Sequence, residues 1–234
     1  MTNISIISDI HGNIEKYNEV HEETDLVIIP GDLFTFDSVE KQMEEVPEFV
    51  RKIDEMFPHA SDIIIVPGNH DYLLERVYNS WNTDIEMRKL FGYKYTLLVD
   101  REMMFINFEN GETLRIYGNP RTNLGMAFPR LWGGNDIKRI PLGLDILITH
   151  EAPRWYSLDC IKESVGMYGD GEPGNQELYE RVFKVKPRYH IFGHIHRQEI
   201  KENNDTIFIN ASQLFRNQFQ PKIINIEVSP LEKD

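Results

Sequence analysis

Polar side chains of the kinds that bind metal ions follow several short apolar runs of the sequence. Two aspartates at the ends of buried strands would repel each other and lose hydration, so a cation is needed to stabilise them. Imidazoles, carboxylates and an amide carbonyl suit divalent manganese, iron, cobalt, nickel or zinc better than calcium, which prefers an all-oxygen shell. The candidates are Asp9, His11, Asp32, Asn69, His70, His150, His194 and His196. They are too many for one four-coordinate ion and predict two ions that share a carboxylate.

Glycines directly precede three of these polar positions. We expect Gly31, Gly68 and Gly193 to adopt backbone conformations that other residues avoid, which would turn the next side chain into the site. The pairs Asp9/His11 and His194/His196 have a spacing of two residues, which places both side chains on one side of an extended backbone. Both pairs can therefore reach one cluster.

Each group of candidate ligands follows a segment with the composition of a buried strand. These segments are Ile4–Ser8, Leu26–Ile29, Ile63–Val66, Ile146–Ile148 and His190–Phe192. Between the early strands, Asp37-x-x-Glu40 resembles a capping box ahead of an amphipathic helix, and Pro47 is expected to kink or divide that helix. Such alternation predicts parallel strands covered by helices, with ligands at the carboxyl ends of the strands.

The middle and the end of the chain predict antiparallel additions to this pattern. Segments 103–109 and 112–117 flank Asn110-Gly111, a strong hairpin signal. A helix is expected over Asn175–Val185, and strands with one solvated face over Thr206–Ala211 and Lys222–Val228. The predicted fold class is α/β, a two-layer mixed β-sandwich flanked by helices, in one domain that spans residues 1–234.

The composition excludes several classes of protein. With 41% apolar and 27% charged residues the chain is an ordinary globular protein, and its net charge of −13 disfavours extended binding to nucleic acid or an anionic membrane. The single cysteine, Cys160, excludes an internal disulfide or a cysteine-built metal site, and we expect it to be buried. Because no apolar run reaches the ~18 residues of a membrane span and no signal peptide begins the chain, we expect a cytoplasmic protein. The sequence does not decide between a monomer and a homodimer.

The complete set of motifs resembles that of the calcineurin-like metallophosphoesterases. Asp9-x-His11, Gly31-Asp32, Gly68-Asn69-His70-Asp71, Thr149-His150 and Gly193-His194-x-His196 occur from residue 9 to residue 196. The segment Gly118-Asn-Pro-Arg-Thr122 further resembles the small metallophosphoesterase-domain proteins, some of which are similar to cyclic-nucleotide phosphodiesterases. The resemblance implies a two-sheet α/β sandwich with outer helices. It also implies that Asp9, His11 and His196 bind one ion, that Asn69, His150 and His194 bind a second, and that Asp32 bridges them.

The resemblance implies a dinuclear phosphoesterase, with manganese favoured among the divalent ions. Such a centre supports in-line attack on phosphorus by a hydroxide that the two ions share. His70 is the histidine of the motifs that this ligand set leaves free, and we expect it to donate to the phosphate or protonate the leaving oxygen. Asp71 stands where the family often has glutamate, and we expect it to act in catalysis, with orientation of an imidazole as one candidate role.

Two loops carry the candidate substrate contacts. Segment 121–141 contains Phe128, Arg130 and Trp132, and Arg154-Trp155-Tyr156 follows the fourth motif. Arginines with aromatic rings suit a nucleotide, and the alternative is a hydrophobic cluster that pins a long loop. We predict Arg121 and Arg154 as substrate contacts, and Asn13 as either a phosphate contact or the N-cap of a helix.

Other polar residues are expected to have structural roles. Glu151 is expected to shape its loop, and His21, His59 and His190 are expected to be surface or satisfied core residues. The charged runs 40–45 and 199–205 predict a solvated helix face and a polar turn.

Two classes of function stay open at this point. The leading hypothesis is an enzyme that hydrolyses small phosphodiesters such as cyclic nucleotides, and the enzymatic alternatives are a phosphomonoesterase and a protein phosphatase. The non-enzymatic alternative is a metal-binding scaffold, which would tolerate the loss of a ligand, and none is missing here. The expected partner is a small phosphorylated substrate.

Overall fold

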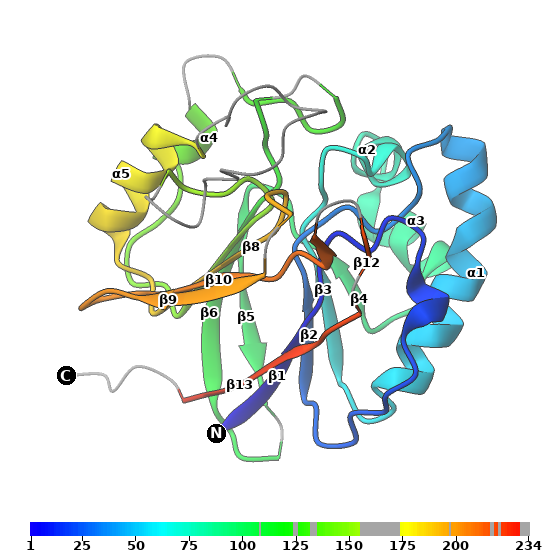
Figure 1. Cartoon of the computed structure of the whole chain (residues 1–234), viewed down its shortest axis with the longest axis horizontal. Helices are drawn as coiled ribbons and strands as arrows, with labels where there is room; N and C mark the ends of the chain where they lie inside the picture. The colour runs from blue at the N-terminus through cyan, green and yellow to red at the C-terminus, as the bar shows by residue number, and fades with distance from the viewer. Residues whose placement is uncertain are drawn as a thin grey trace.

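Two β-sheets lie between two groups of helices (Figure 1). The computed structural model describes residues 1–107, 109–123, 126–131, 135–154, 174–196, 198–215, 218–219 and 221–229. The first sheet has the strand order β13 (Ile224–Val228), β1 (Thr2–Ile6), β2 (Leu26–Ile29), β3 (Asp62–Ile65) and β4 (Tyr95–Leu97). The second has the order β5 (Arg101–Ile106), β6 (Thr113–Asn119), β7 (Ile146–Thr149), β8 (Tyr189–Phe192), β10 (Ile207–Asn210) and β9 (Glu199–Glu202). A short antiparallel pair, β11 (Leu214–Phe215) and β12 (Gln218–Phe219), lies apart from both sheets. The predicted two-layer mixed sandwich flanked by helices is confirmed.

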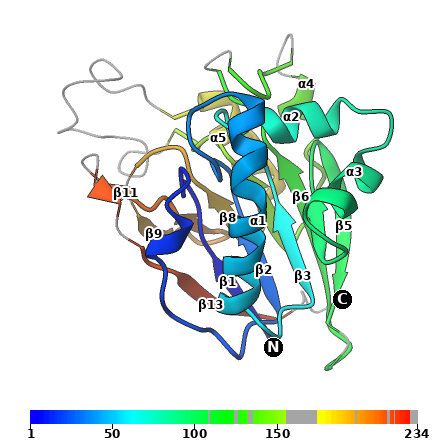
Figure 2. The ribbon, with the colours of Figure 1, turned by 90° about the vertical axis from the view of Figure 1, so that its right-hand side faces the viewer.

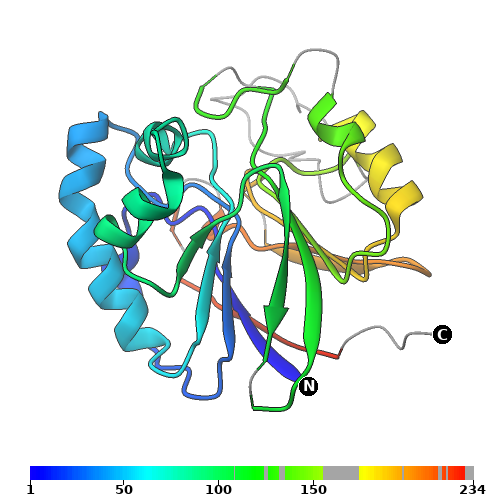
Figure 3. The same ribbon diagram turned by 180° about the vertical axis from the view of Figure 1, so that it is seen from behind.

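Parallel pairing sets the direction of the strands that lead to the candidate ligands. Strands β1 to β4 are parallel to one another, as are β6, β7, β8 and β10. Antiparallel strands occur at the sheet edges, where β13 pairs with β1, β5 with β6, and β9 with β10. Strands β1, β2, β3 and β6 run away from the end of the molecule that holds the N-terminus, so their carboxyl ends lie at the opposite end (Figures 1 and 3).

Helices cover the outer face of each sheet. On the first sheet lie α1 (Val39–Met56), α2 (Tyr72–Tyr78) and α3 (Thr83–Leu90), with a short 3₁₀ helix, η1 (Ile14–Lys16), beside α1; α1 crosses in front of the sheet in Figure 2. On the second sheet lie α4 (Asn135–Lys138) and α5 (Gln176–Val185). No helix in the described part of the chain is both long enough and apolar enough to span a membrane.

The apolar strands are buried on both faces, as their composition predicts. In β2, Leu26 and Ile28 pack between the two sheets, whereas Val27 and Ile29 pack against the cluster that contains the apolar side of α1. All four side chains are fully buried, and burial of each such side chain contributes about 1.5–3 kcal/mol. Successive residues of one strand thus stabilise two separate apolar layers.

Helix α1 differs from its prediction at two positions. Ser38 is the N-cap, with its hydroxyl accepting from the Lys41 N–H, so the cap lies one residue after Asp37. Pro47 does not divide the helix, which is continuous over its whole length. Pro47 has no N–H to donate to the Met43 carbonyl. Because both residues lie on the exposed side of the helix, this carbonyl faces water.

Two connections also differ from prediction. The hairpin β5–β6 forms, but residues 107–112 connect its strands instead of a two-residue turn, because the Gly111 N–H donates to the Asn107 carbonyl. Residues 199–202 form the edge strand β9, where the sequence predicted a polar turn. Its charged side chains suit an exposed sheet edge, which explains why composition alone was misleading.

Candidate metal centre

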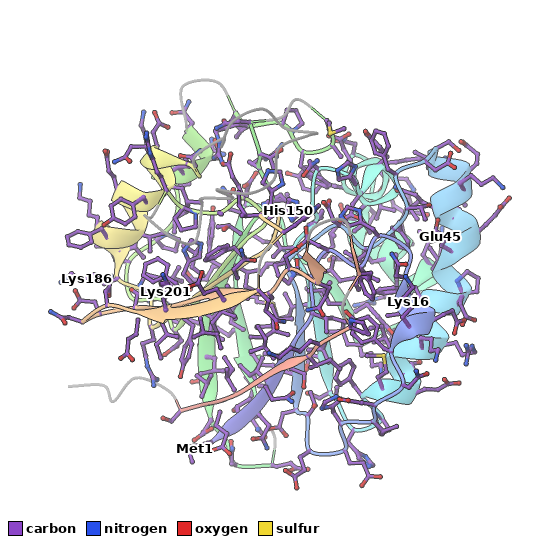
Figure 4. The ribbon with its side chains drawn as sticks, in the orientation of Figure 1. Met1, Lys16, Glu45, His150, Lys186 and Lys201 are labelled. Atoms are coloured by element: carbon purple, nitrogen blue, oxygen red, sulfur yellow. The ribbon has the colours of Figure 1, made fainter. Side chains whose placement is uncertain are left out.

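All seven predicted ligands meet at the carboxyl ends of five parallel strands. Asp9 and His11 follow β1, Asp32 follows β2, and Asn69 follows β3. His150 follows β7, and His194 and His196 follow β8. In Figure 4, His150 lies in the middle of the molecule, between the two groups of helices. The topology therefore brings together residues from both sheets at one place.

Asp9, His11 and His196 form the first group of candidate ligands. One ligand atom from each lies within 4.8 Å of the others, and His196 Nε2 is 3.7 Å from Asp9 Oδ1. His11 Nε2 is buried 3.6 Å from Asp32 Oδ2, and it has no hydrogen-bond partner among the residues that the structure describes. A buried imidazole nitrogen that faces carboxylates without a hydrogen bond fits a metal ligand.

The second group surrounds Asp32 and Asn69. His150 Nε2 lies 3.3 Å from Asp32 Oδ2 and 3.0 Å from Asn69 Oδ1, and His194 Nδ1 lies 3.0 Å from the same amide oxygen. Ligand atoms of Asp9, Asp32 and His150 also lie within 4.8 Å of one another. Asp32 therefore lies between the two groups, where a bridging carboxylate would be required.

The tautomer of His150 is set by a hydrogen bond on its far side. His150 Nδ1 is 2.8 Å from the Pro30 carbonyl, which can only accept, so Nδ1 carries a proton. The lone pair of Nε2 then faces the oxygens of Asp32 and Asn69, all of them acceptors. Burial lowers the pKa of His150, but the carboxylates of Asp32 and Asp9 outweigh it and raise the pKa to about 9. Without a metal ion, a proton on Nε2 satisfies these acceptors. A bound metal ion would satisfy the same acceptors in its place.

The other imidazoles are held in the neutral form that metal ligands require. Burial lowers the pKa of His194 to about 3 and that of His196 to about 4, and it also lowers the pKa of His11. Burial raises the pKa of Asp9, whereas the neighbouring His150 and His11 oppose that shift. The chemistry of the donor set thus fits two divalent ions.

Four candidate ligands occupy left-handed backbone conformations. The φ angles are 52° at Asp9, 45° at His11, 54° at Asp32 and 66° at His194. The expectation that the two-residue spacings lie on extended backbone is therefore wrong, although both pairs do reach the cluster. Such conformations cost about 1–3 kcal/mol each and persist when surrounding bonds fix them. Here the N–H groups of Asp9 and His11 donate to the carbonyls of Gly31 and Asp32.

The three glycines have two different functions. Gly31 has a φ of 95°, as predicted, whereas Gly68 and Gly193 have no positive φ. These two are needed because other groups approach closely. A Cβ at Gly68 would lie 2.1 Å from Asp32 Oδ1, and one at Gly193 would lie 2.3 Å from Asp9 Oδ2. The predicted conformational role holds for Gly31, and close packing explains the other two.

His70 lies beside the predicted ligands, with Nε2 toward Asp32 and Nδ1 buried. His70 Nε2 is 4.0 Å from Asp32 Oδ2, and within the described part of the chain the buried Nδ1 has no partner. Its backbone is fixed on both sides, because the His70 N–H donates to Asp32 Oδ1 and its carbonyl accepts from Gln42 Nε2 at 2.6 Å. Gln42 is fully buried within a run that the sequence predicted as a solvated face, and its role was missed.

Asp71 binds backbone groups. Its Oδ2 accepts from the N–H groups of Asp32 and Gly68 at 2.9 and 2.7 Å, and its Oδ1 accepts from Leu33 at 2.9 Å. Burial and the Asp32 carboxylate raise the pKa of Asp71 to about 7, against these backbone donors. These bonds join the two loops that carry Asp32 and Asn69. Through these contacts Asp71 positions the backbone of both loops, and its predicted role in catalysis stays a prediction.

The predicted substrate contacts have other partners or remain exposed. Asn13 Nδ2 donates to the carbonyls of Ile10 and His11, so the side chain braces the His11 turn and does not cap η1. Arg121 Nε donates to Asp100 Oδ2 at 2.8 Å, which commits this guanidinium to an internal ion pair. Arg154 is exposed. Cys160, Trp132, Trp155 and Tyr156 lie outside the described residues.

A buried ion-pair network, missed by sequence reasoning, holds the loop that follows β6. Arg130 pairs with Asp136 at 2.5 Å and with Glu151, and Asn175 Nδ2 donates to Glu151 at 2.9 Å. Glu151 therefore joins the loop after β7 to the loop after β6 and to the start of α5. No local pattern marks these pairs, because their members come from separate segments. The network supports the alternative in which this loop is pinned, through ion pairs as well as apolar packing.

Comparison with known proteins adds an independent line of evidence. The family model described as "Calcineurin-like phosphoesterase" matches residues 2–198. A UPF0046 protein of Caenorhabditis elegans is 28% identical over 96% of this chain and 80% of its own length. The human "Metallophosphoesterase domain-containing protein 1" is 27% identical over 83% of this chain and 64% of its own length. The crystal structure of TT1561 of Thermus thermophilus aligns with a TM-score of 0.56 at 12% identity, over 92% of this chain and 90% of that one, which supports the fold.

Proposed function

Because this chain belongs to the calcineurin-like phosphoesterase family and is a metal-dependent phosphoester hydrolase, we propose that its substrates are small phosphodiesters, cyclic-nucleotide-like in size and charge. The observation that carries the proposal is the convergence of Asp9, Asp32 and His150 within 4.8 Å, adjoining the group of Asp9, His11 and His196. In this proposal manganese is the favoured metal among the divalent ions that suit imidazole nitrogens together with carboxylate and amide oxygens, namely manganese, iron, cobalt, nickel and zinc.

The residues divide between two ions in the proposed centre. Asp9, His11 and His196 would hold one ion, Asn69, His150 and His194 would hold the other, and Asp32 would be shared. When bound, two divalent ions neutralise charge on the phosphoryl oxygens and lower the pKa of water. The protein holds the ligands in position before binding, through the Pro30 carbonyl at His150 and the backbone donors around Asp9 and His11.

His70 is the proton donor in this proposal. Its fixed backbone and the position of Nε2, 4.0 Å from Asp32 Oδ2, allow it to donate to a phosphate oxygen or to protonate the leaving oxygen. The ring has no described hydrogen bond that would hold its proton elsewhere. This role requires no covalent nucleophile from the protein, since phosphoryl transfer depends mainly on positioning and charge neutralisation.

The charge around the site supports a diester over a monoester. A phosphodiester carries one negative charge, whereas a monoester near neutral pH carries close to two. Arg121 and Arg130 are neutralised by Asp100, Asp136 and Glu151, so neither adds free positive charge for a dianion. The net charge of −13 also disfavours a long polyanionic substrate.

A pair of chromogenic esters tests the substrate class. Protein loaded with manganese is assayed against bis(p-nitrophenyl) phosphate and p-nitrophenyl phosphate, and we expect kcat/KM to favour the diester. A preference for the monoester would contradict the diester proposal and leave the metal-dependent hydrolase intact. Bound manganese without turnover of either ester would instead favour the metal-binding scaffold alternative.

Substitutions separate the roles within the site. His70→Ala should keep two metal ions per chain and lose about 10²–10⁴-fold in kcat, the range for one general acid. Asp32→Asn keeps an acceptor for the His70 N–H but removes the bridging charge, so metal occupancy should fall. His59→Ala, at an exposed histidine in the loop after α1, is the matched control and should change neither. Full activity of His70→Ala would remove His70 from the mechanism.

A further inference from the structure

Phe36 is an exposed aromatic residue that rests on the side chain of His70. It is 62% exposed, and its ring centroid lies 4.7 Å from that of His70 at an interplanar angle of 84°. The His70 ring is in turn 5.2 Å from the His11 ring. Phe36 is thus separated from a candidate metal ligand by a single ring. An exposed phenylalanine needs no explanation in general, but this one lies at the edge of the reaction centre.

The turn that carries Phe36 is held in place from two sides. The Asp37 N–H donates to the Thr35 carbonyl at 2.9 Å, so Phe36 lies at the apex of a tight turn. Gln42 Nε2 donates to the same carbonyl at 2.9 Å, and the Thr35 N–H and hydroxyl both donate to the Glu45 carboxylate. Glu45 is labelled on α1 in Figure 4. An exposed ring on a turn with this many anchors is pre-organised, which lowers the entropic cost of binding to it.

Gln42 also couples this turn to His70. Its amide nitrogen donates to the carbonyls of both Thr35 and His70, and its amide oxygen accepts from the Leu73 N–H at 2.8 Å. One fully buried side chain therefore fixes the position of Phe36 relative to the proposed proton donor.

Tyr72 provides a second aromatic ring at the same place. Its centroid is 6.2 Å from that of Phe36, the two planes are tilted by 46°, and the side chain is partly exposed. We call Phe36 and Tyr72 the aromatic pair: Phe36 lies in the loop after β2, and Tyr72 is the first residue of α2, directly after the loop that follows β3. Asp32 lies in the same loop as Phe36, and Asn69 lies in the loop that leads to Tyr72.

We propose that the aromatic pair binds a planar aromatic ring carried by the substrate ester, and so makes this enzyme selective for nucleoside or aryl esters over alkyl esters. This inference rests on the proposed function, because it assumes that the phosphate lies at the metal centre beside His70. Aromatic rings stack on planar substituents with little regard to their hydrogen-bonding pattern. Phe36 is largely exposed, and the partly exposed ring of Tyr72 lies beside it.

The test measures binding of product-like phosphates without turnover. Manganese-loaded protein is titrated by calorimetry with thymidine 5′-phosphate, phenyl phosphate and methyl phosphate. Phe36→Leu keeps an apolar group against His70 but removes the aromatic face. We expect it to weaken binding of an aromatic phosphate on the order of 10-fold or more, with less than a twofold change for methyl phosphate. Phe36→Trp should restore the affinity.

The three phosphates distinguish whether the bound aromatic ring is a nucleobase or another aryl group. A loss confined to thymidine 5′-phosphate assigns the aromatic pair to a nucleobase, and a loss for phenyl phosphate as well assigns it to aryl groups in general. An equal loss for all three phosphates, or no loss for any, would overturn the proposal. Tyr93→Ala removes another exposed aromatic ring, 86% exposed and packed on Arg88, and is the control that should change nothing.

Failure of this inference is distinguishable from failure of the proposed function. If the wild-type protein hydrolyses no ester but binds thymidine 5′-phosphate in a Phe36-dependent way, the proposed function fails and the aromatic pair stands. If it hydrolyses diesters and Phe36→Leu leaves all binding unchanged, the proposed function stands and the aromatic pair fails.

Discussion

A methyl group added at Gly193 tests whether Asp9 must occupy its present position. Gly193 has no positive φ, so alanine brings no backbone strain at this residue. Its Cβ would lie 2.3 Å from Asp9 Oδ2, 2.2 Å from Ser8 Oγ and 3.2 Å from the Pro30 carbonyl oxygen. The substitution Gly193→Ala therefore acts on the carboxylate of Asp9, a candidate ligand whose oxygen lies within 4.8 Å of ligand atoms of His11, His196, Asp32 and His150.

The size of the effect follows from these distances. Carbon and oxygen atoms approach to about 3.3 Å, so Asp9 Oδ2 must retreat by about 1 Å. That displacement is about twice the ~0.5 Å within which a functional site must be held. We expect overpacking to reduce the free energy of unfolding by about 1–3 kcal/mol. Metal affinity should fall by about 10- to 100-fold, the range for disturbing groups that hold a metal ligand.

Gly118→Ala provides a matched control in the core. A Cβ there would lie 2.5 Å from the Leu98 carbonyl oxygen and 2.8 Å from Val66 Cγ2, so the overpacking is similar. None of those atoms belongs to a candidate ligand. We expect the two variants to lose similar stability in urea with EDTA present, and only Gly193→Ala to lose manganese affinity in calorimetric titration.

Two results would refute this reasoning. Wild-type manganese affinity in a folded Gly193→Ala protein would show that Asp9 is not a ligand or that the close approach is not required. Equal loss of affinity in both variants would show that metal binding reports general stability and not the position of Asp9.

Three further predictions concern charge and stability. Burial lowers the pKa of His190 to about 3, so between pH 6.5 and 3 the unfolded chain binds a proton that the folded chain does not, and stability falls as pH falls. In urea unfolding, the free energy of unfolding of the wild type should fall by about 2 kcal/mol more than that of His190→Gln between pH 7.5 and pH 5. Parallel plots of this free energy against pH for the two proteins would contradict the prediction. Arg130→Met should cost about 3–5 kcal/mol in the same assay, because it leaves Asp136 and Glu151 buried without their cation, and a loss below about 1 kcal/mol would show that the network is not important for stability. Chelation of manganese from protein held at 100 times its Kd should remove about 2.7 kcal/mol of stability, measured as a lower Tm, and an unchanged Tm would argue against a metal bound to the folded state.

The strands and the candidate ligands were predictable because their signals are local. An apolar run such as Leu26–Ile29 predicts a strand buried on both faces, and the polar residue after it marks the carboxyl end. Parallel strands bring such ends together wherever they lie in the sequence. The alternation of residue types therefore suffices to predict both the fold class and the meeting of the seven side chains.

Local signals failed where a side chain has a partner in another segment. Gln42 has the sequence context of a solvated helix face, yet it binds the carbonyls of Thr35 and His70. Arg121 has the composition of a phosphate contact, yet Asp100 holds it. The packing of loops determines such partners, and the sequence near each residue contains no pattern that predicts them.

The sequence by itself determined which residues can bind metal and at which edge of the sheets they meet, because hydrophobic periodicity and residue type act over a few neighbouring positions. Only the tertiary structure decided how they are held. It placed Asp9, His11, Asp32 and His194 in left-handed conformations, and it brought Phe36 against His70. Those outcomes depend on contacts between loops that are distant in the chain, and the free energy of such contacts exists only once the sheets have assembled.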